Sequence, residues 1–253
     1  MALKYNGPLQ MQINDIAQVA EYMWEKGWAE RNAGNISVNI TELVGKENRN
    51  LPVISKTPLQ HVVPELDNQY YYVTAAGSRM RDIARNPMDQ GIVVRVTEEG
   101  SSIETLADKD LPPTMELPSH LLMHRVFAKE ALSNNLPVSS GRRLVFHTHP
   151  TELIALSHIK ALQSSKAVTE TLYRMHPEVT MCIPDGVCWI PYQAPGSIEL
   201  AKASIKDLTR YSFMLWEHHG ILATGTDILD VFDAVDTLNK AAKIYFYIQM
   251  QQK

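Results

Sequence analysis

The stretch Leu144-Val145-Phe146-His147-Thr148-His149-Pro150 predicts a buried strand that runs into a helix. The apolar residues are typical of a strand inside a sheet, and Pro150 suits the first turn of the helix that follows. Alternate residues of a strand point to the same face, so His147 and His149 can present two imidazoles to one metal ion. Most His-x-His pairs in strands are surface or core residues that bind no metal, so a metal site needs further ligands.

A second histidine cluster, His218-His219-Gly220, follows much later in the chain. Adjacent side chains on extended backbone point in opposite directions, so only one of these two histidines can join His147 and His149. The sequence leaves open which one, although Gly220 would let the backbone approach closely at His219.

His120 and His124 form a rival pair, because histidines four residues apart share one face of a helix and could chelate a metal themselves. Without a His-Glu-x-x-His pattern this spacing usually indicates a polar helix face, which is the interpretation adopted here. His158 and His176 have no partner at ligand spacing and are predicted to be surface residues.

Glu116 lies directly before a predicted helix over 117–131 that carries Pro118 in its first turn. Beside a metal site this carboxylate could be a fourth ligand or, if it is desolvated, a general base with a raised pKa. The alternative is an acid at a helix N-terminus, where the helix dipole favours it.

Two segments rich in small and polar residues are candidate phosphate sites, Asn32-Ala33-Gly34-Asn35 and Thr74-Ala75-Ala76-Gly77-Ser78. Main-chain N–H groups in such segments, with amides or hydroxyls beside them, can hold a phosphate without net positive charge. The ordinary alternative is two simple turns.

The composition is that of a globular protein of 253 residues, 45% hydrophobic and 21% charged. A formal net charge of -4 argues against nucleic acid as the main partner. Because no signal core or membrane-spanning run is apparent, we expect a cytoplasmic protein without a membrane partner. Cys182 and Cys188 lie in a predicted hairpin over 179–190 and are predicted to be reduced, half-buried thiols.

The order of the predicted elements favours an α/β fold with a largely antiparallel central sheet, in one domain over residues 1–253. The stretch 41–68 is assigned no regular structure. Helices are predicted over 10–28, 117–131, 151–158, 166–175, 197–209 and 227–250. Strands are predicted over 36–40, 70–74, 91–96, 143–147, 212–216 and 221–224, besides the hairpin.

Five segments together resemble the class II aldolase and adducin family, and within it the bacterial enzymes that cleave L-rhamnulose 1-phosphate. They span nearly the whole chain in the family's order, so the resemblance is highly specific. The segments are KGWAERNAGN (26–35), PTMELPSH (113–120), HTHPTELIAL (147–156), PDG (184–186) and WEHHG (216–220).

The resemblance implies a three-layer α/β/α fold and a zinc-dependent aldolase with one Zn²⁺ per chain. The implied reaction is the reversible cleavage of L-rhamnulose 1-phosphate into dihydroxyacetone phosphate and L-lactaldehyde. In that family the metal ligands match His147, His149 and His219, while His218 points elsewhere, and the catalytic base matches Glu116.

The resemblance also implies a homotetramer in which a neighbouring subunit contributes a second acid, which matches Glu178. The phosphate of the sugar substrate is expected to bind against Asn32, Gly34, Asn35 and Gly77.

The chain departs from the family pattern in this phosphate pocket. Ala76 and Met115 stand where the family has serines, so two hydroxyl donors are missing, and Ser78 or Thr114 are candidates to compensate. Family members also tend to continue beyond the closing helix, so a tail over the active site is not expected from this sequence.

Two alternatives stay open. One keeps the metal and changes the sugar, to fuculose phosphate for an aldolase or to ribulose phosphate for an epimerase, although the stretches 28–32 and 117–118 favour rhamnulose phosphate. The other is an adducin-like interaction module without catalysis, which the presence of all three ligand histidines and of Glu116 disfavours.

Overall fold

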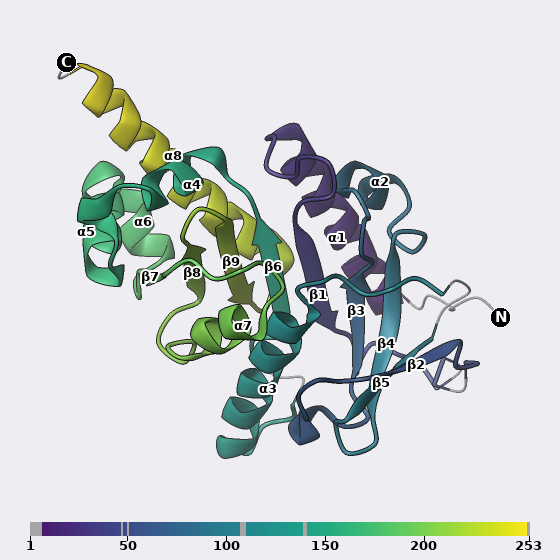
Figure 1. Ribbon diagram of the computed structural model, residues 1–253. Coiled ribbons are helices and arrows are strands. Elements are labelled where there is room, and N and C mark those ends of the chain that lie inside the picture. Colours follow the sequence, from purple (N-terminus) through teal and green to yellow (C-terminus); the bar gives the residue numbers. More distant parts are fainter. Residues whose placement is uncertain (1–6, 47, 50, 107–109, 139–140, 252–253) are drawn as a thin grey trace.

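The nine strands in the described part of the chain form one sheet at the centre of the computed structural model (Figure 1). The structure describes residues 7–46, 48–49, 51–106, 110–138 and 141–251. The strands follow the order β2-β5-β4-β3-β1-β6-β9-β8-β7, and of these pairings only β7 with β8 is parallel. The predicted α/β fold with a largely antiparallel sheet is confirmed.

The strands are β1 (Asn35–Asn39), β2 (Ser55–Pro58), β3 (Tyr70–Thr74), β4 (Gly91–Thr97), β5 (Ser102–Thr105), β6 (Leu144–Thr148), β7 (Val187–Ile190), β8 (Phe213–Trp216) and β9 (Gly220–Gly225). The α-helices are α1 (Gly7–Glu25), α2 (Met80–Arg85), α3 (Leu117–Ser133), α4 (Thr151–Ser157), α5 (Ser165–Met175), α6 (Pro177–Cys182), α7 (Ile198–Ile205) and α8 (Ile228–Gln251). Two short 3-10 helices, η1 (Pro64–Leu66) and η2 (Lys160–Leu162), complete the list.

Helices cover both faces of the sheet, which is the middle of three layers (Figure 1). Successive residues of a strand point to opposite faces, so Tyr70 and Tyr72 of β3 pack into one core and Tyr71 and Val73 into another. The first core joins the sheet to α1, α2, α4, α5, α6 and α8. The opposite face is covered by α3 and α7.

The predicted hairpin over 179–190 is wrong. Residues Pro177–Cys182 form α6, and only Val187–Ile190 join the sheet, as β7. Val179 and Ile183 are four positions apart and buried in the same core, which is helical spacing. Pro177 fits the first turn of this helix. The helical spacing of the buried residues and the proline at the helix start therefore outweigh the β-branched composition of the segment.

Besides the two 3-10 helices, three short elements escape prediction: α2, β2 and β5. The edge strand β2 lies inside the stretch 41–68, and Lys56, Thr57 and Pro58 are exposed, so no buried face shows in its sequence. Its partner β5 reads Ser-Ile-Glu-Thr, with one apolar residue. Hydrophobic periodicity can be recognised only in amphipathic segments that are longer than these three.

Both cysteines are free thiols, but Cys182 is exposed and Cys188 is buried, so neither is half-buried as predicted. In the part of the chain that is described, no helix combines the length and the apolar character needed to cross a membrane. The single domain and the cytoplasmic location stay predictions.

The central strands position the candidate site. β6 lies between β1 and β9, and its register places His147 opposite both Asn35 and Leu222. Directly opposite residues of antiparallel strands share a face. Since His147 also shares its face with Val145, which packs in the core beneath α3 and α7, Asn35 and His147 lie together on that side of the sheet.

Candidate active site

Three histidines from two parts of the chain converge at one end of the sheet. His147 belongs to β6, His149 follows it before α4, and His219 lies in the turn between β8 and β9. The Nε2 atoms of His147 and His149 are 3.1 Å apart, and each of the three side chains offers one nitrogen within 4.8 Å of the others. This is the geometry that a single divalent ion requires.

Hydrogen bonds fix which ring nitrogen is free in the first two histidines. His147 Nδ1 donates to the carbonyl oxygen of Ile221 at 2.9 Å, and His149 Nδ1 lies 2.9 Å from Glu30 Oε1, which can only accept. In the neutral rings both Nε2 atoms therefore carry lone pairs, and they face each other. Such lone pairs repel unless a cation lies between them, so the donor set fits a metal ion with oriented ligands.

Burial keeps His147 and His219 in the neutral form that binds metals. It lowers the pKa of His147 well below its ordinary value, with His149 and His219 adding to the effect, and it lowers the pKa of His219 to about 4. Trp216 is buried beneath the cluster, with its ring 4.6 Å from that of His147 and 5.1 Å from that of His219. Neutral imidazoles at pH 7 follow from this desolvation.

The turn between β8 and β9 decides which histidine of the second cluster reaches the others. His218 has a φ of 62° and its ring stacks on His158 at 3.9 Å, away from the cluster. His219 points inward, and its Nδ1 is buried without a hydrogen-bond partner among the described residues. A Cβ on Gly220 would lie 2.5 Å from the carbonyl oxygen of Thr148, so the close approach of β9 to β6 requires glycine here.

Glu116 is buried at the start of α3 and is only partly satisfied. Its Oε1 accepts a hydrogen bond from the Gly196 N–H at 2.9 Å, while its Oε2 is buried without a partner among the described residues. Burial raises the pKa of the carboxyl to about 7, against the lowering effect of the Gly196 hydrogen bond. A carboxyl group poised near neutrality is suited to take and return a proton.

The three histidines and Glu116 line one pocket of about 210 Å³. All four residues of the predicted phosphate site, Asn32, Gly34, Asn35 and Gly77, line the same pocket, as do Thr114 and Met115. Gly34 has a φ of 81°, and a Cβ there would lie 2.6 Å from Met23 Cε. Ser78 is not in the lining; its hydroxyl donates to the carbonyl oxygen of Gln90.

Glu178 lies apart from this pocket. It sits in the first turn of α6, is exposed, and is not among the residues that line the cavity. His176 is half-buried and His158 is exposed, so the surface prediction holds for His158 alone.

The interpretation of His120 and His124 as a polar helix face is wrong. Both are buried, at 0% and 3% exposure, between α3 and the sheet. Each ring is hydrogen-bonded to Ser37 of β1, and His120 also contacts Asn35. The spacing is that of one helix face, as expected, but the face is turned inward. Residue spacing alone does not distinguish the two cases.

Glu30 and Trp216 are site residues that the single-residue patterns did not reveal. Only their position inside the segments 26–35 and 216–220, which resemble the family, could have identified them, because a glutamate or a tryptophan alone does not indicate a metal site.

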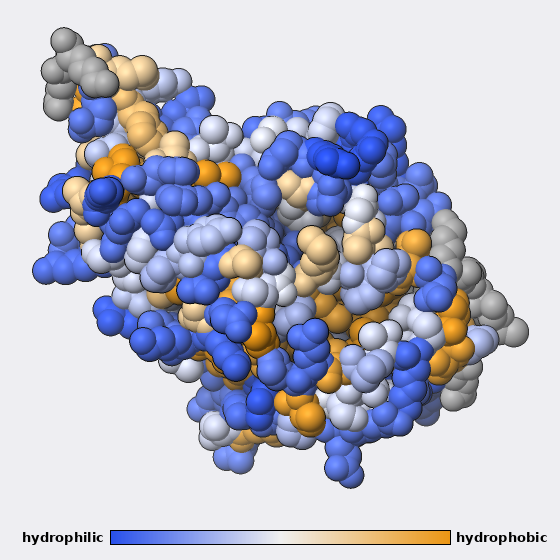
Figure 2. All heavy atoms as spheres, in the orientation of Figure 1, coloured by the Kyte–Doolittle hydropathy of each residue, from blue (hydrophilic) through white to orange (hydrophobic). Residues whose placement is uncertain are grey.

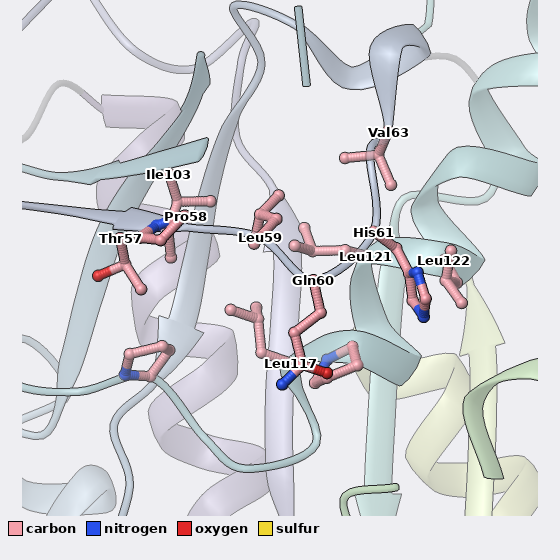
Figure 3. A pocket seen from close by; sticks show the side chains of 12 residues that line it. Thr57, Pro58, Leu59, Gln60, His61, Val63, Ile103, Leu117, Leu121 and Leu122 are labelled. Carbon is pink, nitrogen blue, oxygen red and sulfur yellow. The ribbon is translucent and has the colours of Figure 1, made fainter. Parts of the chain in front are cut away.

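A second cavity, of about 150 Å³, lies between the stretch 57–63 and the first turns of α3 (Figure 3). Its walls are mainly apolar, with Leu59, Leu117 and Leu121 among them, and His61 is the one lining residue of a metal-ligating type. The metal-ligand set and the raised-pKa carboxyl therefore belong to the other pocket.

The profile of the Class II Aldolase and Adducin N-terminal domain family matches residues 14–246. The rhamnulose-1-phosphate aldolase of Bacteroides thetaiotaomicron is 43% identical over 238 residues, which cover 94% of this chain and 86% of the relative. That of Enterococcus faecalis is 32% identical over 247 residues, covering 94% and 84%.

Among solved structures, the sugar-phosphate aldolase of Thermotoga maritima superposes with a TM-score of 0.80 at 29% identity, covering 98% of each chain.

The raised pKa of Glu116 predicts a specific dependence of stability on pH. The folded protein holds this proton up to about pH 7 whereas the unfolded chain releases it near 4.5, so the contribution of Glu116 to stability falls as pH rises through that window. Glu116→Gln does not titrate. We expect the metal-free variant to gain up to about 3 kcal/mol over the metal-free parent between about pH 5 and about pH 8.

Urea unfolding of both proteins in the presence of a chelator measures this difference. A gap in stability that is the same at both pH values would show that Glu116 titrates normally.

Proposed function

The chain belongs to the class II aldolase and adducin family, and from that premise we propose that it reversibly cleaves L-rhamnulose 1-phosphate into dihydroxyacetone phosphate and L-lactaldehyde. The observation that carries the proposal is the meeting of three histidines and one buried carboxyl in a single pocket. Relatives at 43% and 32% identity are rhamnulose-1-phosphate aldolases, which supports a metal-dependent aldehyde-lyase with this substrate.

The metal is proposed to be zinc, one ion per chain, held by His147, His149 and His219. Three imidazole nitrogens with room for one further group are typical of catalytic rather than structural zinc. When bound, such an ion would disperse the negative charge that develops on the carbonyl oxygen as the neighbouring carbon–carbon bond breaks.

Glu116 is the proposed general base. In condensation its carboxylate takes a proton from the carbon beside the carbonyl of dihydroxyacetone phosphate, and in cleavage the carboxyl returns it. The pKa near 7 and the free Oε2 fit this role, and the Gly196 N–H holds the other oxygen so that the carboxyl keeps one orientation.

The phosphate is proposed to bind against Asn32, Asn35 and the main-chain N–H groups at Gly34 and Gly77. No lysine or arginine is among the residues that line the pocket, so neutral N–H donors must supply the contacts. Thr114 is the remaining hydroxyl in the lining, although it already accepts a hydrogen bond from the Glu116 N–H.

Glu178 is proposed to complete the pocket of a neighbouring chain in a homotetramer. Its exposure and its absence from the lining of its own pocket support a role in trans. Figure 2 shows apolar surface on the projecting end of α8, where Tyr247, Ile248 and Met250 are exposed, as expected of a surface that another subunit covers.

The direct test is a coupled assay of the metal-loaded protein with three substrates: L-rhamnulose 1-phosphate, L-fuculose 1-phosphate and L-ribulose 5-phosphate. We expect L-rhamnulose 1-phosphate to release dihydroxyacetone phosphate faster than L-fuculose 1-phosphate does, and faster than L-ribulose 5-phosphate is epimerised. Faster turnover of fuculose or ribulose phosphate would move the specificity to another sugar, and no turnover of any would support a binding module.

Alanine at His147, His149 or His219 should remove the metal and the activity together, because each supplies one of three ligands. His218→Ala is the matched control and should keep the metal, since His218 stacks on His158 outside the cluster. Mass spectrometry measures the metal content of the three ligand variants and of the His218→Ala control. A metal-free His218→Ala beside a loaded His219→Ala would reverse the assignment.

Glu116→Gln should keep the metal but lower kcat by about 100-fold or more, because the amide preserves shape and cannot accept a proton. The effect on KM should be small. Turnover close to that of the parent would make Glu116 a structural acid at the start of α3.

Asn32→Ala should raise KM for the sugar phosphate about tenfold with little change in kcat, through the loss of one hydrogen bond to a charged group. The inhibition constant of inorganic phosphate, a competitor, should rise by a similar factor. If both constants stay at the parental values, the phosphate binds elsewhere.

Mixtures of Glu116→Gln chains and Glu178→Ala chains should be more active than either variant alone. In hybrid tetramers some sites then combine an intact Glu116 with an intact Glu178 from different subunits. Native mass spectrometry confirms subunit exchange. Exchanged mixtures without a gain in activity would place Glu178 in its own subunit's site or outside catalysis.

A further inference from the structure

A row of four buried polar side chains lies between β1 and α3, directly beside the pocket. Asn35 and Ser37 come from β1, and His120 and His124 come from successive turns of α3; none is more than 7% exposed. His124 Nε2 lies 2.8 Å from Ser37 Oγ, Ser37 Oγ lies 2.7 Å from His120 Nδ1, and His120 Nε2 lies 2.6 Å from Asn35 Oδ1. The four residues form one unbranched chain of hydrogen bonds.

The direction of every hydrogen bond in this chain follows from its first acceptor. Asn35 Oδ1 is a carbonyl oxygen and can only accept, so His120 Nε2 carries the proton. Burial lowers the pKa of His120 to about 3, so the ring is neutral and its Nδ1 accepts from the Ser37 hydroxyl. The Ser37 oxygen in turn accepts from His124 Nε2–H.

This polarity has a consequence for the pocket. With Oδ1 of Asn35 held by His120, the amide nitrogen Nδ2 is on the opposite side of the carboxamide, and Asn35 lines the pocket. An amide that turned over would present its oxygen to the pocket instead. An oxygen repels a phosphate, whereas an N–H₂ group donates to it.

We propose that His120 is a positioning residue that fixes the Asn35 amide with its N–H₂ group toward the phosphate of the substrate. The proposal rests on the function proposed above, and it adds His120 to the residues that make the pocket specific for a phosphorylated substrate. It accounts for the desolvated imidazole of His120 in a core where an apolar side chain would cost less to bury.

His124 provides a matched control. It occupies the same face of α3 one turn later and is equally buried, but its ring packs on Tyr71 at 4.6 Å and it reaches Asn35 only through Ser37 and His120. A phenylalanine at 120 removes the donor to Asn35, and a phenylalanine at 124 removes only the far end of the chain.

In the metal-loaded enzyme we expect His120→Phe to raise KM for L-rhamnulose 1-phosphate about tenfold and to leave kcat within about threefold. His124→Phe should leave KM within about twofold of the parent, although both variants lose stability. The inhibition constant of inorganic phosphate should rise with KM in His120→Phe. Metal content, measured in each variant, should stay at one ion per chain.

A pair of amide variants covers the case in which phenylalanine disrupts folding. Gln at 120 can place its amide nitrogen near the position of His120 Nε2 and so rescue the contact with Asn35. Asn at 120 is too short to reach it. His120→Gln should therefore keep KM near the parental value, and His120→Asn should raise it about tenfold.

Equal KM values in His120→Phe and His124→Phe, or in the Gln and Asn variants, would overturn the proposal and make His120 a core residue. A parent enzyme that does not cleave the sugar phosphate would instead overturn the proposed function. The parental assay therefore separates the two failures.

Discussion

The close approach of β9 to β6 is the constraint on which the site depends. Gly220 lets the turn before β9 reach the carbonyl of Thr148, and this contact brings His219 to the two histidines at the end of β6. The same strand, β6, pairs on its other side with β1, which sets Asn35 opposite His147. One strand register thus places both the metal-ligand set and the amide beside it, and a slip by one residue would turn both away.

Burial, and not a nearby charged side chain, is the main cause of the shifted pKa values in the site. Burial lowers the pKa of His147 and His219 and raises that of Glu116, so desolvation disfavours the charged form of all three groups before an ion binds. The lining of the pocket has no lysine or arginine, so its positive charge would come from the proposed divalent ion. The proposed phosphate contacts would then be made by N–H donors, which is why the orientation of the Asn35 amide matters to the proposal.

The sequence predicted the fold class and most long elements, because the alternation of apolar residues shows in short stretches of the chain. It predicted the residues that meet in the pocket, because they lie in the segments that resemble the family. The residue pattern alone could not decide between His218 and His219, since the left-handed backbone at His218 is a property of the folded turn, and the choice of His219 came from the family resemblance. It misjudged His120 and His124 because spacing gives a helix face but not the direction that face points. It missed Glu30, whose carboxylate forms a hydrogen bond with His149 Nδ1 although the two residues are far apart in the sequence.

The proposed zinc ion is bound beside Glu116 by three imidazole nitrogens and by no sulfur. X-ray absorption at the zinc edge of the protein loaded with one equivalent of metal tests this proposal most directly. The account predicts about three nitrogen ligands at roughly 2.0 to 2.1 Å with an oxygen completing the shell. Sulfur ligands at about 2.3 Å, or an ion held only by water and carboxylate oxygens, would contradict it.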